Sequence, residues 1–369
     1  MTTALLKKTP LHDWHAEHQG RMVDFAGWSM PVQYASIVEE HVATRTAAGL
    51  FDISHMGRLR FDGPDAARFL DYLVTRRVDD MTAGKIRYAL VTNRAGGVLD
   101  DVLVYSLTDA NGPFHMMVVN ASNCDKICDW IEQHVGGFDV RWQNQTMETS
   151  MIAVQGPRAL EIARPLLEPD PASLRYFCGT VTNVAGQSSV VSRTGYTGED
   201  GLELIVPNEI AVEVWSKLMA SGSNHGLAAA GLGARDTLRL ESGMPLYGHE
   251  LTEQINPLEA DLGFAVSLQD RDFIGRAALA AIKQTGTART RVGLKLDGKR
   301  APREHYAVLS DGEAVGEVTS GTFSPTLQYP VGMAYVKRAL AEAGNRLEVD
   351  IRGKSFPATV VPLPFYKRP

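Results

Sequence analysis

The spacing of the apolar residues changes near residue 290, and this change constrains the fold more than any other feature of the chain. Before it, stretches with helical spacing alternate with short apolar runs that are typical of strands. After it, short strand-like runs recur between turn dipeptides, a pattern typical of an all-β domain. The turn dipeptides are Asp297-Gly298, Asp311-Gly312 and Arg352-Gly353. We therefore predict an α+β body over residues 1–275, a linker within 277–290 and a small C-terminal antiparallel β-barrel over 288–369.

Several elements of the body can be placed from the sequence. The predicted helices lie at 34–48, after Gly63-Pro64, after Ser122 as the capping residue, near 209–220 and near 231–242. The predicted strands lie at 58–61, 88–92, 98–105, 114–119, 151–154, 189–193 and 202–206. On the first helix, Ile37, Val38, His41 and Val42 share one face. The loop 93–97 joins two of the strands as a predicted hairpin.

Composition excludes several classes of protein. Of the 369 residues, 44% are hydrophobic and 22% are charged, which excludes disordered, collagen-like and coiled-coil chains. The net charge of −6 argues against a protein that coats nucleic acid or an anionic membrane. Three cysteines are too few for a secreted disulfide framework, and no apolar run approaches the ~20 residues of a membrane helix. We expect a cytosolic protein whose partners include neither nucleic acid nor a membrane.

Standard nucleotide, nucleophile and metal motifs are missing from the sequence. It contains no phosphate-binding loop, no nucleophile elbow and no zinc helix of the H-E-x-x-H type. The histidines at positions 12, 15 and 18 have helical spacing but no further ligand, so we interpret them as solvated surface side chains. Cys124 and Cys128 lie four residues apart and are interpreted as buried reduced thiols. We predict no metal site.

Two neighbouring carboxylates interrupt a strongly apolar strand. Asp100 and Asp101 follow Val98-Leu99 and precede another apolar run. Since successive strand residues point to opposite faces, at least one of the two carboxylates is expected to face inward. A buried carboxylate is unfavourable unless it is paired or has a task, so a catalytic and a structural interpretation both stay open.

Two further charged residues stand in apolar surroundings. Glu203 lies between two leucines of a predicted strand, and Arg235 lies within a largely apolar helix. Tyr88, Tyr196 and Tyr247 would suit a flat heterocyclic ligand or an ordinary core. A carboxylate accepts two parallel N–H bonds from an amino-pyrimidine edge. Solvent exposure of Glu203 and of Arg235 is the competing interpretation.

Six sequence blocks occur in order and span nearly the whole chain. The blocks are Met22–Tyr34, Gly49–Gly57, Thr92–Asp101, Arg193–Glu203, Gly233–Glu241 and Thr319–Pro325. Together they resemble the glycine cleavage system T-protein family of aminomethyltransferases. The resemblance implies a three-part cloverleaf around a central folate site, in which two α+β subdomains, one of them roughly 53–140, form the body and the barrel is the third part.

The resemblance also implies a reaction and its partners. The lipoyl arm of H-protein carries an aminomethyl group, and the T-protein transfers its one-carbon unit to tetrahydrofolate, giving 5,10-methylenetetrahydrofolate and ammonia. Tetrahydrofolate is thus the implied co-substrate, without a metal, and the P- and L-proteins are the other members of this system of glycine catabolism.

Site residues carry over at the matching positions. The resemblance implies that Asp101 is the catalytic aspartate, that Glu203 holds the amino edge of the pterin, and that Arg235 is the cation near the folate. The other positions implied to line the folate pocket are Met56, Tyr88, Val118, Asn120, Tyr196 and Tyr366. For Met56 and Val118, a place in the ordinary core is the competing interpretation.

Two alternative functions belong to the same fold. One is a folate-dependent demethylase of a small methylated substrate, but the blocks ending at Gly57 and at Asp101 favour the T-protein. The other is a non-catalytic folate-binding protein of iron–sulfur maintenance. Those proteins carry a cysteine in the segment corresponding to 195–199, which has none here. The absence of a recognisable transit peptide favours a bacterial cytoplasm over a mitochondrial matrix.

Overall fold

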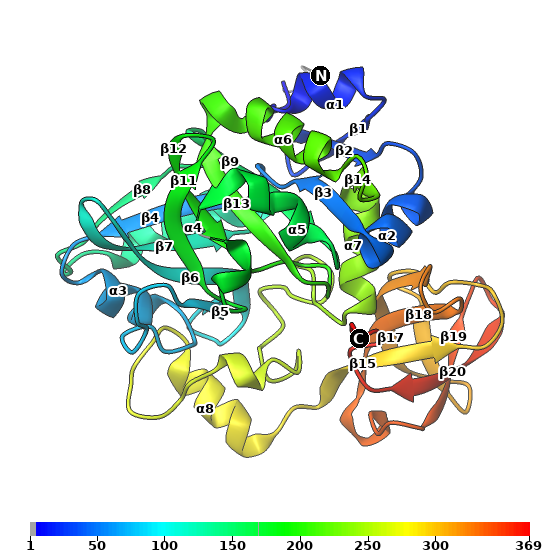
Figure 1. Ribbon diagram of the computed structural model, residues 1–369. Helices are drawn as coiled ribbons and strands as arrows, with labels where there is room; N and C mark the ends of the chain where they lie inside the picture. The colour runs from blue at the N-terminus through cyan, green and yellow to red at the C-terminus, as the bar shows by residue number, and fades with distance from the viewer. Residues whose placement is uncertain (1–4, 169) are drawn as a thin grey trace. The chain divides into compact units, whose positions relative to one another are not determined.

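The computed structural model describes residues 5–168 and 170–369 (Figure 1). The chain divides into two compact units, each built from several stretches of sequence. The first unit comprises Met1–Leu70, Val78–Tyr88 and Val102–Asp236. The second unit comprises Asp71–Arg77, Ala89–Asp101 and Thr237–Pro369. In the part of the chain that the structure describes, no helix is long and apolar enough to cross a membrane.

A mixed seven-stranded sheet forms the centre of the first unit. Its strands, in spatial order, are β10 (Leu167–Glu168), β11 (Gly179–Val184), β12 (Gln187–Ser192), β13 (Gly201–Pro207), β9 (Thr149–Gln155), β3 (Ala48–Asp52) and β14 (Leu227–Ala229). Neighbouring strands are antiparallel, except that β14 runs parallel to β3. The predicted strands at 151–154, 189–193 and 202–206 are therefore confirmed as parts of one sheet.

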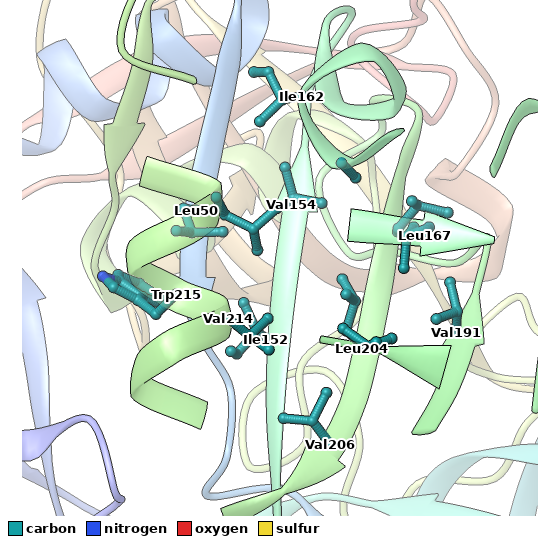
Figure 2. Packing of buried hydrophobic residues seen from close by; sticks show 14 of the residues in the cluster. Leu50, Ile152, Val154, Ile162, Leu167, Val191, Leu204, Val206, Val214 and Trp215 are labelled. Atoms are coloured by element: carbon teal, nitrogen blue, oxygen red, sulfur yellow. The ribbon is translucent and has the colours of Figure 1, made fainter. Parts of the chain in front are cut away.

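Helices α5 (Ala159–Ala163) and α6 (Asn208–Gly222) cover one face of this sheet. Figure 2 shows Trp215 of α6 beside Leu50 and Ile152, with the apolar side chains of the central strands in the same cluster. Trp215 is fully buried. Because burial of apolar surface contributes about 25 cal/mol per Å², this cluster is a main source of stability for the unit. The alternate residues of β13, Glu203 among them, point to the opposite face of the sheet.

A five-stranded antiparallel sheet carries the predicted hairpin. Its order is β5 (Ile86–Thr92), β6 (Val98–Asp109), β7 (Gly112–Val119), β4 (Gly57–Asp62) and β8 (Arg141–Asn144). In the connecting loop, the side-chain Oδ1 of Asn93 accepts hydrogen bonds from the backbone N–H groups of Ala95 and Gly97, both at 3.0 Å. Gly96 has a φ of 86°, a conformation that glycine adopts without strain. Helix α3 (Ala66–Leu73) follows Gly63-Pro64 as predicted.

A small N-terminal hairpin precedes these sheets. Helix α1 (His12–Glu17) leads into β1 (Arg21–Phe25) and β2 (Trp28–Gln33), which pair antiparallel. The two turn residues, Ala26 and Gly27, have φ values of 52° and 78°. Two successive positive φ values are typical of the type I′ turn, whose twist matches that of a two-stranded ribbon.

Helix α2 (Ile37–Thr46) confirms the predicted helix but not all of its apolar face. Val38 and Val42 are 55% and 41% exposed, whereas Glu40 is buried together with His41 and Thr44. Glu40 is buried because its carboxylate accepts backbone N–H bonds from Tyr34, Ala35 and Gly231. These backbone N–H groups need an acceptor, and this need determines which face of α2 is buried. The spacing of apolar residues does not reveal it.

The helix predicted to start at Ser122 begins later. Residues Ala121–Asn123 form a 3₁₀ turn, and α4 (Cys124–His134) has Asn123 in the capping position, without a side-chain capping bond. Ser122 as the cap is therefore wrong. Ile127 and Ile131 lie on the buried face of α4 as expected from their spacing.

The C-terminal part of the second unit is a closed six-stranded barrel, as predicted. Its order is β15 (Arg289–Leu296), β18 (Pro330–Lys337), β17 (Glu313–Phe323), β16 (Ala307–Ser310), β19 (Arg346–Asp350) and β20 (Ser355–Val361), and β20 pairs back to β15. Leu294, Val318 and Val349 are among the side chains that fill its interior. The predicted linker 277–290 is largely helical, because α8 spans Arg276–Thr285. The α+β class is confirmed, whereas the domain boundaries and the cloverleaf arrangement stay predictions.

Candidate functional site

Glu203 lies at the centre of β13 and is buried, with 4% of its surface exposed. Its neighbours Leu202 and Leu204 belong to the apolar cluster, so Glu203 points to the opposite face of the sheet. The Oγ1 hydroxyl of Thr194 donates to Glu203 Oε2 at 2.5 Å, and the Oγ of Ser192 lies 2.7 Å from that hydroxyl. Solvent exposure of Glu203, the competing interpretation, is thereby excluded.

Burial raises the pKa of Glu203 above its ordinary value of 4.5. The hydrogen bond from Thr194 and the positive charge of Arg235 oppose this rise, but desolvation dominates. The carboxyl group can therefore hold a proton more readily than an exposed glutamate. It can donate a hydrogen bond when protonated and accept two when ionised.

Arg235 projects from helix α7 (Leu232–Glu241). The centre of its guanidinium group lies 4.9 Å from the centroid of the Tyr196 ring, within the range of a cation–π contact. Its Nη1 atom is buried, and no hydrogen-bond partner for it exists among the described residues. Burial lowers the pKa of Arg235, opposed by the charge of Glu203, yet a guanidinium stays protonated in proteins. The result is a half-buried arginine whose buried Nη1 donor is left open.

His55 is a polar residue of this region that the sequence did not single out. It follows β3, is 3% exposed, and its Nδ1 atom has no partner within the described part of the chain. Burial lowers the pKa of His55 to about 3; the charge of Asp52 opposes this shift, and those of Arg235 and Arg58 add to it. The imidazole is therefore neutral at physiological pH. The available signal was its place in the Gly49–Gly57 block, next to Met56.

Met56 and Val118 are both neighbours of the buried residue Arg58. Arg58 is fully buried, and its Nη1 donates to the backbone oxygen of Met56 at 2.5 Å. Across strands β4 and β7, Arg58 pairs with Val118, which is 4% exposed. Arg58 also donates to the backbone oxygens of Ser54, Thr146 and Thr149. These bonds fix the segment 54–58, which carries both His55 and Met56.

Tyr88 and Asn120 are half-buried residues of the five-stranded sheet region. Tyr88 belongs to β5, and Asn120 follows β7 at the start of the 3₁₀ turn. The structure thus joins Glu203, Arg235 and Tyr196 through direct electrostatic and ring contacts. For Tyr88 and Asn120, the positions are known from β5 and from the end of β7.

Asp100, Asp101 and Tyr366 belong to the second unit. Asp100 is fully buried and Asp101 is half-buried, on opposite faces of β6. The expectation that at least one of the pair faces inward is confirmed. The backbone N–H of Tyr366 donates to the oxygen of Glu241 at 2.8 Å, which attaches the C-terminal segment within this unit.

The interpretation of the three N-terminal histidines as solvated is wrong for His15, which is fully buried. The ionised Asp52 can only accept, so His15 Nε2 donates to its Oδ2 at 2.9 Å, and Nδ1 accepts from the Tyr34 hydroxyl at 2.8 Å. Asp52 also accepts from Thr9 Oγ1 at 2.7 Å and from the Ser54 N–H at 2.9 Å. Burial raises the pKa of Asp52, but the bonds and charge of His15, with those of Ser54 and Thr9, lower it to about 2.

The sequence also predicts no metal site, and buried reduced thiols at Cys124 and Cys128. Among residues 5–168 and 170–369, no group of three or more histidine, cysteine or acidic side chains is arranged to hold a metal ion. All three cysteines are free; Cys124 is buried, and Cys128 is partly exposed. Burial is confirmed for Cys124 and is incomplete for Cys128, and the reduced state stays a prediction.

The first unit therefore presents a carboxyl group of raised pKa, an arginine with an open donor, an aromatic ring and a neutral imidazole. These groups can bind the amino and carbonyl edge of a flat heterocycle, since each donor or acceptor matches a polar ring substituent. An open buried donor is unfavourable in the free protein, and a ligand acceptor would satisfy it.

Family models and known proteins match nearly the whole chain. The GCVT N-terminal domain matches residues 11–270, and the glycine cleavage T-protein C-terminal barrel domain matches residues 289–367. An aminomethyltransferase of Moorella thermoacetica is 47% identical over 99% of each chain. One from Saccharopolyspora erythraea is 46% identical over 98% of each. The crystal structure of glycine cleavage system aminomethyltransferase T from Bartonella henselae is similar with a TM-score of 0.92 and 33% identity, covering 98% of this chain and 99% of that one.

Proposed function

This chain belongs to the glycine cleavage T-protein family and is an aminomethyltransferase, and we propose that it transfers the one-carbon unit of an aminomethyl-lipoyl arm to tetrahydrofolate. The products are 5,10-methylenetetrahydrofolate, ammonia and the dihydrolipoyl arm. The observation that carries the proposal is the group of Glu203, Arg235 and Tyr196 within a chain that matches the family over nearly its full length. The relatives support this function and neither of the two alternatives.

Glu203 is the proposed partner of the amino edge of the pterin. Its carboxyl group is held in one orientation by the Thr194 hydroxyl, and its raised pKa suits a site in which a proton is shared with a heterocyclic nitrogen. Arg235 supplies the open Nη1 donor for an acceptor on the ligand. Tyr196 lies against the guanidinium and offers a ring face for stacking.

Met56, Tyr88, Val118, Asn120 and Tyr366 are proposed lining residues of the folate pocket. Met56 is supported by the hydrogen bond of Arg58 that holds its backbone oxygen, and Val118 by its place opposite Arg58 in the pairing of β4 and β7. Tyr88 and Asn120 are supported by their half-buried positions, which leave part of each side chain accessible. Tyr366 is supported only by its position near the C-terminus.

Asp101 is the proposed catalytic carboxylate. A positioned carboxylate orients the reacting nitrogens and moves a proton between them as the carbon–nitrogen bond to the departing ammonia breaks. The half-buried state of Asp101 supports this role, whereas Asp100 is fully buried and suits a structural one.

The lipoylated H-protein is the proposed partner, with the P- and L-proteins as the other members of the system. Tetrahydrofolate is proposed as the co-substrate, without a metal. We also propose that the chain acts in a bacterial cytoplasm, since the relatives described above are bacterial proteins. The domains proposed for this activity are 1–275, with one subdomain at roughly 53–140, and 288–369.

The test is a turnover assay with aminomethyl-lipoyl H-protein and tetrahydrofolate, in which ammonia and methylenetetrahydrofolate are measured together. Equal amounts of both products are expected, and no turnover under conditions that support another T-protein would contradict the proposal. Asp101→Asn should lower the rate by about a hundredfold or more with the fold intact. Asp100→Asn is the matched control, and a larger loss of rate in that variant would show that the catalytic carboxylate was misassigned.

A further inference from the structure

Cys124 and Cys128 stand one helical turn apart at the start of α4. Both thiols are free. Residues four apart lie on the same face of a helix, so their side chains are neighbours. Cys124 is 9% exposed, whereas Cys128 is partly exposed. A reagent can therefore reach the pair from the side of Cys128.

A single amide group contacts both sulfur atoms. The Nδ2 atom of Asn144, on β8, lies 3.6 Å from the Sγ atom of each cysteine. The orientation of this amide follows from its other end, because Asn144 Oδ1 accepts from the backbone N–H of Thr146 at 3.0 Å and from its hydroxyl at 2.5 Å. The NH₂ group therefore faces the sulfur atoms, where it stabilises negative charge.

The pKa values of the two thiols are shifted in opposite directions. A hydrogen bond from Cys128 lowers the pKa of the Cys124 thiol to about 6; burial opposes this shift, and bonds from Thr146 and Asn144 add to it. Cys124 is also the first residue of α4, where the helix dipole favours an anion. The pKa of the Cys128 thiol is raised, chiefly by its bond to Cys124. Of the two thiols, that of Cys124 is therefore the one that ionises more readily.

The same amide links the thiol pair to the segment 54–58. The hydroxyl of Thr146, which donates to Asn144, accepts from the backbone N–H of Arg58 at 3.0 Å. Arg58 in turn holds the backbone oxygen of Met56. Gly57 lies directly against Cys124, since a Cβ atom on this glycine would be 2.7 Å from the sulfur. The sulfur atoms are thus connected by direct contacts to a segment that contains Met56, a proposed lining residue of the folate pocket.

We propose that Cys124 and Cys128 form an oxidation-sensitive dithiol, which a hydroperoxide converts to a disulfide within α4. The Cys124 thiolate attacks the terminal oxygen of the hydroperoxide, the O–O bond breaks, and the alkoxide or hydroxide that leaves takes up a proton to become an alcohol or water. The sulfenic acid on Cys124 is then attacked by the sulfur of Cys128, which loses its proton as the S–O bond breaks and water leaves. Two thiols are oxidised by two electrons, and the hydroperoxide is reduced by the same two.

Disulfide formation requires a local change in α4. The Cβ atoms of residues four apart on a helix are about 5–6 Å apart, whereas a disulfide needs about 3.5–4.5 Å. The first turn of α4 must therefore open, and Asn144 must lose its present contacts with the sulfur atoms. We expect the disulfide to loosen segment 54–58 and to weaken tetrahydrofolate binding; this consequence, unlike the thiol chemistry, rests on the proposed function.

The test treats the full-length protein with one equivalent of hydrogen peroxide and maps its peptides. The wild-type chain should lose two thiols and the mass of two hydrogens, with Cys124 and Cys128 in one cross-linked peptide. Cys178→Ser is the matched control and should behave as the wild type does. Cys128→Ser should stop at a sulfenic acid that a 1,3-dione traps, and Cys124→Ser should react at least about tenfold more slowly. A wild-type chain that forms no disulfide between these residues, or one that uses Cys178, would overturn the proposal.

A second measurement separates this inference from the proposed function. Tetrahydrofolate binding is compared for reduced protein, oxidised protein and oxidised protein treated with dithiothreitol. Binding should weaken at least about threefold on oxidation and recover on reduction. Unchanged affinity in a chain whose disulfide is proven would refute the link to segment 54–58. A reduced protein that binds no tetrahydrofolate would instead contradict the proposed function, while the peptide map would still decide on the dithiol.

Discussion

Helix α7 carries two arginines four residues apart, one in each compact unit, and their surroundings differ sharply. In the second unit, Arg239 donates from Nη1 to Glu250 Oε2 at 2.8 Å and from Nη2 to Ser320 Oγ at 2.8 Å. In the first unit, Arg235 has a buried Nη1 with no hydrogen-bond partner among the described residues. Both terminal nitrogens of Arg239 therefore donate to other side chains, whereas the Nη1 donor of Arg235 is left without a partner among the described residues.

The pKa values of two buried carboxyl groups, Glu203 in the first unit and Glu250 in the second, are shifted in opposite directions. Burial raises the pKa of both, but at Glu250 the charge of Arg239 and several hydrogen bonds outweigh burial and lower the pKa. At Glu203 burial prevails and the pKa is raised. A buried ion pair makes each of its members necessary, because removing one leaves the other uncompensated, whereas an incompletely paired charge is retained at a cost, which a ligand can offset. The comparison therefore separates a structural ion pair from a binding site.

The largest expected effect is on stability, from Arg239→Met. This change leaves Glu250 buried without its cation, and breaking a buried pair in this way costs about 3–5 kcal/mol. Urea unfolding measures the loss. In the double variant with Glu250→Gln, much of it should be recovered, because no uncompensated charge is left. A loss no larger than that of Arg235→Met would refute the distinction between the two arginines.

Arg235→Met should chiefly change binding. The free energy of unfolding is expected to stay within about 1 kcal/mol of the wild type, since a buried cation with an open donor contributes little to stability. Tetrahydrofolate binding should weaken by about 1–3 kcal/mol, the value of a hydrogen bond to a charged group. Calorimetric titration of this variant and of Glu203→Ala provides the comparison. Full affinity in both variants would place the ligand elsewhere.

The two glutamates should respond to pH in opposite directions. The folded-state pKa of Glu203 is raised, so its contribution is favourable below about pH 4.5 and is lost as pH rises through the folded pKa. Glu203→Gln should therefore gain stability relative to the wild type as pH rises. The folded-state pKa of Glu250 is lowered, so its contribution is present above about pH 4.5 and is lost as pH falls. Glu250→Gln should be the less stable protein at neutral pH, and its deficit should shrink in acid.

Urea unfolding at several values from about pH 2 to about pH 8 measures both pH trends, since the Glu250 contribution is lost below its unfolded pKa and that of Glu203 above it. The wild-type curve serves as the reference at each pH, so that other titrating groups cancel. Parallel trends for the two glutamine variants would contradict the contrast between the carboxylates.

The smallest expected effect comes from Tyr196→Leu, which removes the ring beside Arg235. A cation–π contact at a partly exposed site contributes about 0.5–1 kcal/mol. Unfolding should be affected by no more than this, and Tyr196→Phe, which keeps the ring, should stay close to the wild type. If the phenylalanine variant lost as much as the leucine variant, the hydroxyl rather than the ring would be the important group.

The sequence predicted the elements of the fold well, because apolar spacing determines which face of a strand or helix can be buried. The strand around Glu203 and the barrel after residue 289 followed this rule. It failed for Val38 and Val42, because the carboxylate of Glu40 is turned inward by three backbone N–H groups, one of them from residue 231. The hydrogen bond from residue 231 to Glu40 joins distant parts of the chain, so the sequence around Glu40 contains no sign of it.

The candidate site was predictable in part. Glu203 and Arg235 were identified as charges in apolar surroundings, and the burial of Glu203 and of the Arg235 Nη1 atom bears out that signal. His55 and Thr194 were not identified, because a histidine or threonine in a strand or loop is unremarkable until its neighbours are known. His15 was misread for the same reason, since the aspartate that buries it lies 37 residues away.

The hydrogen bonds that Asp52 accepts from Thr9 and His15 have a practical consequence for anyone who shortens this chain. A recombinant product that began at Arg21 would keep both strands of the N-terminal hairpin yet deprive a buried anion of two of its donors. It would be expected to express poorly and to be cut readily by proteases. The segment that carries Thr9 and His15 should therefore be kept in any shortened chain, because these two side chains are buried and satisfy Asp52.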